Sequence, residues 1–311
     1  MPVALLCGLA LAVGLTGCSS GPPAFEKPPV RVVVTTTMIA DLVKGVGGER
    51  VAVDTLMGPG IDPHRHITTL EDRKKIENAH LVFFNGLHLE GKMTDTFEKS
   101  RGRIRGYAVT DAIDKSLLRH AEVDGGEHDP HVWFDVLLWS NCVGTVKDAL
   151  VALDPAGRDT YETNAAAYRR ELEALDKEVR AELAKVSPKE RRVLVTSHDA
   201  FGYFGRAYGF EVRGLQGVST ASESGTKDVK ELVDFLGQNR IPAVFTETSV
   251  PDSGLKRVLD ACQRDHRHTV KLVGGDEALY SDALGEPGTP AGTYVGMVRH
   301  NVAAIVRALS N

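Results

Sequence analysis

The sequence is poor in cysteine and lacks the patterns in which cysteines usually hold a metal. Only four cysteines occur in 311 residues, and no two of them form a Cys-x-x-Cys pair. A thiolate metal site of the zinc-finger type is therefore not expected. Cys142 and Cys262 lie in the body of the chain, where they form either two thiols or one disulfide.

The signatures of nucleotide and nucleic-acid binding are also missing. No P-loop and no Gly-x-Gly-x-x-Gly pattern follows the first predicted strand, and no His-Glu-x-x-His pattern is present. Lys and Arg number 37 against 42 Asp and Glu, which gives a net charge of −5. Because the chain contains no basic run or aromatic platform, we expect no nucleic acid among its partners.

The N-terminus carries an uncharged apolar run over residues 3–15. This run is shorter than the roughly 17 to 25 residues that span a membrane, and it is typical of a secretory signal. The adjoining Leu15-Thr16-Gly17-Cys18 resembles a bacterial lipobox, although no Lys or Arg precedes the apolar run. We predict a signal peptide over 1–17 and a lipidated Cys18 on a flexible tether over 18–30. The chain is then exported and anchored by lipid alone, facing the periplasm or the cell exterior.

Strands and helices are predicted to alternate along the chain. A hydrophobic content of 42% supports a sizeable core, and 311 residues favour two lobes over one. In the first half, Thr68 and Glu71 have capping-box spacing and open a helix that runs to about Ala79. Such alternation predicts an α/β fold with parallel sheets flanked by helices. The predicted strands cover 31–37, 51–56, 81–84, 192–196, 210–214, 243–246 and 269–273, and further helices cover 38–46, 228–239, 253–264 and 293–309.

A long run of strong helix formers separates the two halves. Residues 164–179 place Leu172, Leu175 and Val179 on one stripe, and Ser187-Pro188 ends the pattern. We predict a linker helix within 154–188, between an N-terminal lobe over 31–153 and a C-terminal lobe over 189–311. The alternative is an ordinary amphipathic helix packed on one lobe.

Four side chains spread over the chain are candidate metal ligands. The tripeptide Asp-Pro-His occurs twice and ends on His64 and His131, each held on stiff backbone by the preceding proline. His198 ends the buried strand-like run that starts at Val193, and Asp282 lies in a loop flanked by glycine. In parallel sheets, ligands gather beyond the carboxyl ends of strands. The pattern predicts one transition-metal site between two lobes.

The order of motifs along the chain resembles the zinc- and manganese-binding lipoproteins of bacterial metal ABC importers. The resemblance covers the chain from Arg31 to its end, and it implies two α/β lobes joined by one long backbone helix. It also implies four metal ligands, at His64, His131, His198 and Asp282. The protein would then be a monomer that captures metal without catalysis, and its partners would be an importer permease and its ATPase. The motifs are the lipobox, Asp62-Pro63-His64, Asp129-Pro130-His131-Val132-Trp133, Thr196 to Phe204, Gln216 to Thr220, Phe245-Thr246-Glu247 and Tyr280-Ser281-Asp282.

The donor set bears on which metal is carried. Three imidazoles and one carboxylate suit tetrahedral Zn²⁺, whereas Mn²⁺ prefers more oxygen ligands and binds most weakly in the divalent series. Members of this family that resemble manganese importers often carry Glu at the position of His198, so His198 speaks against manganese. Members that resemble dedicated zinc importers often carry a long His- and acid-rich loop before the second ligand. The corresponding residues 119–128 form a short stretch with only two histidines, which speaks against the commonest zinc type. We expect one Zn²⁺ per chain, with Mn²⁺ as the alternative.

Further polar residues near the candidate ligands allow two interpretations. Asp62, Asp129 and Glu247 are candidates to accept a ring N–H from a ligand histidine. Equally, Asp62 and Asp129 are placed to stabilise their own turns through the backbone. Four other histidines are not expected to be ligands. We expect His66 at the rim of the site, His266 and His268 in a solvated loop, and His300 on the last helix.

Two other classes of function compete with metal import. Three histidines and a carboxylate can hold a catalytic zinc, but Asp282 would close the open coordination position that such enzymes keep. A surface adhesin that uses the metal only for stability is the second alternative.

Overall fold

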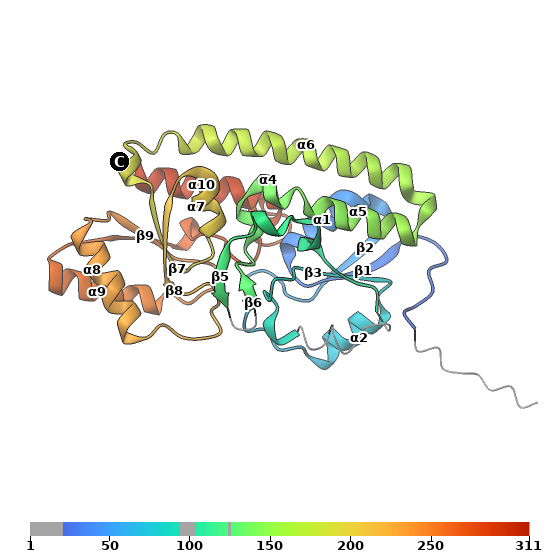
Figure 1. The fold of residues 1–311 in the computed structure, drawn as a ribbon, viewed down its shortest axis with the longest axis horizontal. Helices are drawn as coiled ribbons and strands as arrows, with labels where there is room; N and C mark the ends of the chain where they lie inside the picture. The colour runs from blue at the N-terminus through green and yellow to red at the C-terminus, as the bar shows by residue number, and fades with distance from the viewer. Residues whose placement is uncertain (1–20, 94–96, 98–103, 124–125, 311) are drawn as a thin grey trace, which may run out of the picture.

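Two separate parallel sheets form the body of the protein (Figure 1). The structure is a computed structural model that describes residues 21–93, 97, 104–123 and 126–310. The first sheet has the order β2-β1-β3-β4 and the second has the order β10-β9-β7-β8. Their strands are β1 Val30–Val34, β2 Val51–Thr55, β3 Leu81–Phe84, β4 Gly106–Ala108, β7 Val193–His198, β8 Glu211–Gln216, β9 Ala243–Phe245 and β10 Lys271–Val273.

Helices pack on both sheets, so the predicted α/β class with two parallel sheets is confirmed. The N-cap of α2 is Thr69, whose side chain accepts from the backbone of Asp72, one residue later than the predicted pair of Thr68 and Glu71. The predicted signal peptide and the lipobox lie outside the described residues. The helices are α1 Thr37–Gly47, α2 Leu70–Asn78, α4 Val136–Trp139, α5 Cys142–Leu153, α7 Gly202–Tyr208, α8 Thr226–Gln238, α9 Ser253–His266 and α10 Tyr294–Leu309.

One long helix, α6 (Arg158–Leu183), runs along the top of both sheets in Figure 1. Its 26 residues extend roughly 39 Å at about 1.5 Å per residue. A buried stripe that includes Tyr161, Leu172 and Val179 packs against α1 and α5 from the first half and against α10 from the second. The predicted backbone helix is therefore present, and it both connects the two halves and packs on each of them.

The apolar core on the α6 side is continuous between the two halves. Phe83 of the first sheet and Phe245 of the second belong to the same buried cluster, with Trp133 also in it. The indole N–H of Trp133 donates to the carbonyl of Ser281 at 2.9 Å, and the Tyr294 hydroxyl donates to the carbonyl of Trp133 at 2.7 Å. Because this seam is apolar and close-packed, the two halves cannot separate here without opening the core.

The two cysteines in the body of the chain lie in different parts of the core. Cys142 belongs to the shared cluster and Cys262, on α9, to a second cluster that α8 and α9 form with the second sheet. Both are buried free thiols, which decides the alternative that the sequence left open.

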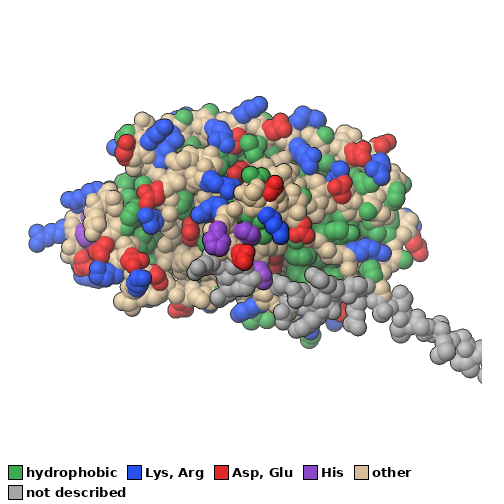
Figure 2. Space-filling view, viewed as in Figure 1, with side chains coloured by type: hydrophobic (Ala, Val, Ile, Leu, Met, Phe, Trp, Pro, Cys, Tyr) green, Lys and Arg blue, Asp and Glu red, His purple; other side chains and the backbone are tan. Residues whose placement is uncertain are grey.

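One segment of the described chain, Val136–Leu153, is apolar and long enough to cross a membrane by composition. Half of it is buried within the protein, where α5 packs on α1 and α6. That packing identifies it as a core segment. On the face shown in Figure 2, acidic and basic side chains are interspersed, so this face presents no extended basic patch.

Candidate metal centre

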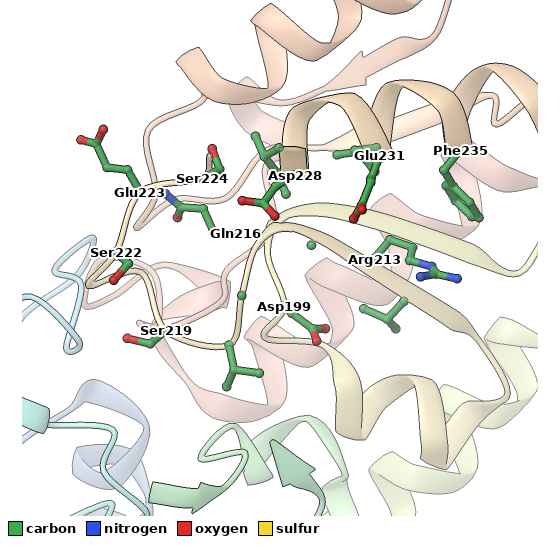
Figure 3. A pocket seen from close by; sticks show the side chains of 16 residues that line it. Asp199, Arg213, Gln216, Ser219, Ser222, Glu223, Ser224, Asp228, Glu231 and Phe235 are labelled. Carbon is green, nitrogen blue, oxygen red and sulfur yellow. The ribbon is translucent and has the colours of Figure 1, made fainter. Parts of the chain in front are cut away.

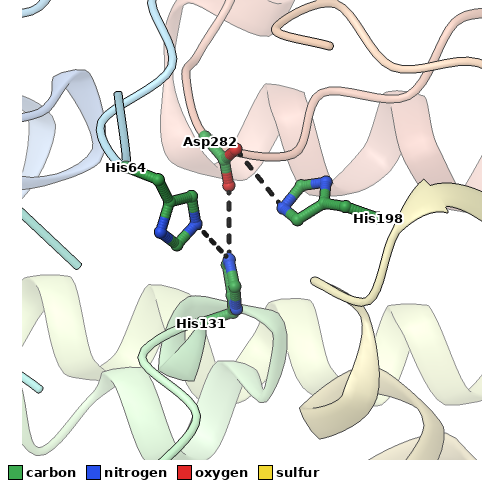
Figure 4. A group of neighbouring side chains, drawn as sticks. All are labelled: His64, His131, His198 and Asp282. Carbon is green, nitrogen blue, oxygen red and sulfur yellow. Dashed lines mark hydrogen bonds and ion pairs between the residues drawn. The ribbon is translucent and has the colours of Figure 1, made fainter. Parts of the chain in front are cut away.

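His64 lies in the loop between β2 and α2, and the turn before it is held by Asp62. Oδ1 of Asp62 accepts the backbone N–H of His64 at 2.9 Å. The other oxygen, Oδ2, accepts the hydroxyl of Thr220 at 2.5 Å. Asp62 therefore stabilises its own turn, which was the second interpretation of this residue. The His64 side chain is buried and points toward the centre (Figure 4).

His131 follows a short antiparallel hairpin of β5 (His120–Val123) and β6 (Gly126–His128). Oδ1 of Asp129 accepts the backbone N–H of His131 at 3.0 Å and lies 2.8 Å from the ring Nδ1. Asn85 adds a hydrogen bond from its Nδ2 to the carbonyl of Pro130 at 3.1 Å. The carboxylate of Asp129 therefore has both roles considered for it, because it stabilises its own turn and also orients the ring of His131.

His198 is the last residue of β7, and Glu247 lies beyond the end of the neighbouring β9. Oε1 of Glu247 accepts the backbone N–H of His198 at 2.9 Å, and Oε2 lies 2.5 Å from the ring Nδ1. Parallel pairing brings these strand ends together, so two residues 49 positions apart meet at one edge of the sheet.

Asp282 comes from the loop beyond Leu279, which pairs with Glu247 in an isolated bridge. The hydroxyls of Ser249 and Ser281 share a hydrogen bond of 2.8 Å beside it. The backbone N–H of Leu284 donates to the hydroxyl of Thr37 at 2.7 Å, which ties this loop to α1.

The four predicted ligands meet at one buried point (Figure 4). One ligand atom from each residue lies within 4.8 Å of every other. Nε2 of His64 is 3.2 Å from Nε2 of His131, which in turn is 3.5 Å from Oδ1 of Asp282. Nε2 of His198 is 3.4 Å from Oδ2 of Asp282. Zinc bonds of about 2.0 to 2.1 Å in a tetrahedron place neighbouring donors about 3.3 Å apart, which these separations match.

The chemistry of the donors also fits a cation. Both oxygens of Asp282 and Nε2 of His198 are buried without a hydrogen-bond partner among the described residues. Their contacts are ion pairs: Oδ1 of Asp282 faces Nε2 of His131, and Oδ2 faces Nε2 of His198. Buried polar atoms in native proteins almost always have partners, so a cluster of such orphans aimed at one point is typical of a ligand site. Within the described residues, no other group of His, Cys, Asp and Glu converges in this way.

The three imidazoles differ in their affinity for protons. Burial lowers the pKa of His64 to about 3, so this ring is neutral at physiological pH. Burial also disfavours charge on His198, but the carboxylates of Glu247 and Asp282 outweigh it and hold the pKa of His198 well above its usual value. The pKa of His131 is raised likewise, by Asp129 and Asp282 against burial. Burial would raise the pKa of Asp282, but the neighbouring imidazoles His198 and His131 depress it well below its usual value.

The other histidines singled out in the sequence lie away from this group. His66 is 3.1 Å from Asp72 at the start of α2, and His300 on α10 is 2.9 Å from the carbonyl of Ala278. The pair expected in a solvated loop is more ordered than predicted, because His266 ends α9 and each side chain has a partner. His266 lies 3.2 Å from Asp234, and His268 lies 2.8 Å from the carbonyl of Ile241.

The sequence did not predict two residues that hydrogen-bond the carboxylates holding the ligand histidines. Arg119 donates to Oδ2 of Asp129 at 2.6 Å, and it lies against Gly202, where a Cβ would overlap the guanidinium. Thr220 holds Asp62, as described above. Neither residue carries a local signal, since each acts through a partner brought near only by folding. The motif that ends on Thr220 was visible in the sequence, but its role was not.

Comparison with known proteins agrees with this geometry. Residues 32–308 match the family described as zinc-uptake complex component A, periplasmic. The chain is 46% identical over 310 residues to the zinc-binding protein TroA of Treponema pallidum, covering 98% of each chain. It is 45% identical over 298 residues to the manganese-binding lipoprotein MntA of Bacillus subtilis, covering 95% of each.

A solved structure of the periplasmic zinc-binding protein TroA from Treponema pallidum superimposes with a TM-score of 0.86 at 47% identity. It covers 92% of this chain and 100% of the solved one, so the likeness extends over both lobes and the helix between them. The fold, the buried site of three histidines and one aspartate, and the match of the family over nearly the whole chain point the same way. The chain belongs to the zinc-uptake component A family and is a non-enzymatic, metal-binding, substrate-binding component of an ABC transporter.

Proposed function

We propose that this protein captures one Zn²⁺ ion between its lobes and delivers it to an importer permease that is driven by a cytoplasmic ATPase. His64 and His131 bind the ion from the first lobe, and His198 and Asp282 bind it from the second. The observation that supports this most directly is the convergence of these four buried side chains, whose ligand atoms all lie within 4.8 Å of one another and include three contacts of 3.2 to 3.5 Å. Asp282 supplies a negative charge to a site that is otherwise built from imidazoles.

The preference for zinc rests on the donor set. Three imidazole nitrogens and one carboxylate favour tetrahedral Zn²⁺, and Mn²⁺ would gain only one further oxygen from a bidentate Asp282. Manganese is the second candidate, because two relatives with different metals are almost equally similar to this chain. The manganese-binding lipoprotein is 45% identical and the zinc-binding protein is 46% identical. Identity alone therefore does not separate the two metals.

Members of the family act outside the cytoplasm, and the relatives include lipoproteins and periplasmic proteins. We propose that Cys18 carries the lipid after removal of residues 1–17, and that residues 18–30 tether a monomer to the membrane. The lobes then span 31–153 and 189–311, joined through 154–188. This arrangement keeps the metal site free to reach a permease in the same membrane.

The test is metal content by mass spectrometry on protein that lacks residues 1–18. The protein is stripped with a chelator and then dialysed against equal Zn²⁺ and Mn²⁺, with His198→Ala as the ligand variant and His268→Ala as the matched control. One zinc per chain in the wild type and the control, lost in His198→Ala, is the expected result. One manganese per chain would keep the site and overturn the metal preference, and retention of neither ion would overturn the function.

A further inference from the structure

The motif Gln216 to Thr220, at the end of β8, has no part in the ligand set, yet its last residue is almost completely buried. Thr220 is 1% exposed, although the loop around it lines two cavities. Figure 3 shows Ser219 and Ser222 of this loop lining a cavity of about 550 Å³. Thr220 does not line that cavity; it lines a neighbouring one together with Asp62, to which its hydroxyl donates.

The partner of Thr220 is the carboxylate that holds a metal ligand. Its hydroxyl donates to Oδ2 of Asp62 at 2.5 Å, while Oδ1 of Asp62 accepts the backbone N–H of His64 at 2.9 Å. A single carboxylate therefore connects a residue of the second lobe to a ligand of the first. A hydrogen bond to a charged acceptor in a half-buried place is among the stronger ones.

The contacts between the lobes differ on the two sides of the metal centre. On the α6 side the lobes share an apolar core, with hydrogen bonds from Trp133 to Ser281 and from Tyr294 to Trp133. On the side of the His64 loop, a side-chain hydrogen bond between Thr220 and Asp62 joins that loop to the second lobe. An apolar seam resists opening far more than a single polar contact does.

Two cavities adjoin the His64 loop and leave it space to move. A cavity of about 600 Å³ is lined by Ile61, Asp62 and Arg65 together with residues of the second lobe. A smaller cavity of about 230 Å³ is lined by His64 itself together with Ser219 and Ala221. The other histidines lack this freedom, since the rings and backbones of His131 and His198 are both held by buried carboxylates.

We propose that Thr220 is a positioning residue for His64, and that its bond to Asp62 is a latch whose opening precedes release of the metal. With the bond intact, the loop holds His64 at the centre. With the bond broken, the loop swings into the neighbouring cavities and takes one of the four ligands away, while the core on the α6 side stays closed. This inference rests on the proposed capture of a metal ion by these four residues.

The test compares rates of metal release from the mature chain loaded with Zn²⁺, measured by stopped-flow mixing with a chromogenic chelator. Thr220→Val removes the hydroxyl and keeps the shape, and we expect release at least about tenfold faster than in the wild type. Thr220→Ser restores a hydroxyl and is expected to release close to the wild-type rate. The matched control is Thr145→Val, which deletes a half-buried hydroxyl bonded to the Val109 carbonyl, away from the metal.

A double-mutant cycle separates a latch from general damage. If the bond is the latch, Thr220→Val adds no further acceleration in an Asp62→Ala background. Additive effects, or release from Thr220→Val at the rate of the wild type, would overturn the latch and leave metal capture intact. A wild type that retains no ion would instead overturn the proposed function. Should Thr220→Val fail to fold, Thr220→Ala removes the same hydroxyl without a new methyl group and provides the same comparison.

Discussion

The carboxylate of Glu247 should govern both the affinity of the site and the protons released when metal binds. The substitution Glu247→Gln keeps the size of this buried side chain and removes its charge. In the wild type, Nδ1 of His198 lies 2.5 Å from Oε2, and Nε2 points to the metal centre. Metal binding through Nε2 requires the ring proton to be on Nδ1, which is the tautomer that Glu247 stabilises.

The magnitude follows from the two contacts that Glu247 makes. Glutamine can still accept the backbone N–H of His198 through one oxygen, so the strand end should stay in place. Its amide cannot replace the charge opposite Nδ1. Loss of such an outer partner typically weakens metal binding by about 10- to 100-fold, or about 1.4 to 2.7 kcal/mol.

The effect should depend on pH in a defined direction. Glu247 is one of the two charges that hold the pKa of His198 above its usual value, so the metal-free wild type binds a proton that Zn²⁺ must displace. Glu247→Gln lowers that pKa and reduces the competition. The loss of affinity should therefore be largest above the raised pKa and should shrink as pH falls, with fewer protons released per ion.

Competition calorimetry with Zn²⁺, in buffers of different ionisation enthalpy, measures both quantities in one experiment. The control is Glu178→Gln, which makes the same change in an exposed ion pair with Arg299 and should bind metal as the wild type does. Wild-type affinity together with wild-type proton release in Glu247→Gln would refute the role assigned to this carboxylate.

Three further predictions concern stability. The raised pKa values of His131 and His198 stabilise the metal-free fold fully below pH 6.5, and this contribution is lost as pH rises through the raised values. Stabilisation by bound Zn²⁺ grows over the same range, so melting curves with and without metal should diverge as pH rises. Leu172→Ala, at a fully buried position on α6, should cost about 2 to 5 kcal/mol in urea unfolding and shift both lobes in one transition, because they share a core; two separate transitions would contradict this. A reducing agent should leave the melting temperature unchanged, because Cys142 and Cys262 are not bridged, and a clear drop would show otherwise.

Much of the architecture was predictable because it depends on local patterns. Short β-branched runs separated by helices specified parallel sheets, and the run of strong helix formers specified α6. The prediction was least accurate at element ends and in weak patterns. The N-cap of α2 is one residue later than predicted, and the hairpin of β5 and β6 was not predicted, since its strands have only four and three residues.

The candidate ligands were visible for a related reason. Proline before His64 and His131, and a strand end at His198, are properties of a few neighbouring residues, and a parallel sheet gathers its strand ends on one edge. The sequence alone therefore predicted the kind of site, the four residues that meet at it and the two-lobed fold around it. Whether Asp62 and Asp129 hold a ring or only a turn stayed open at that level.

Only the tertiary structure decided how those donors are supported. Thr220 and Asp62 are 158 residues apart, and Arg119 reaches Asp129 only because Gly202 of the other lobe leaves room for it. The separation of the two cysteines and the continuous core beneath α6 are likewise properties of packing. The physical reason is common to all of these contacts. Each depends on side chains from distant segments meeting at a hydrogen-bond or van der Waals distance, and that distance is defined only once both lobes have folded against each other.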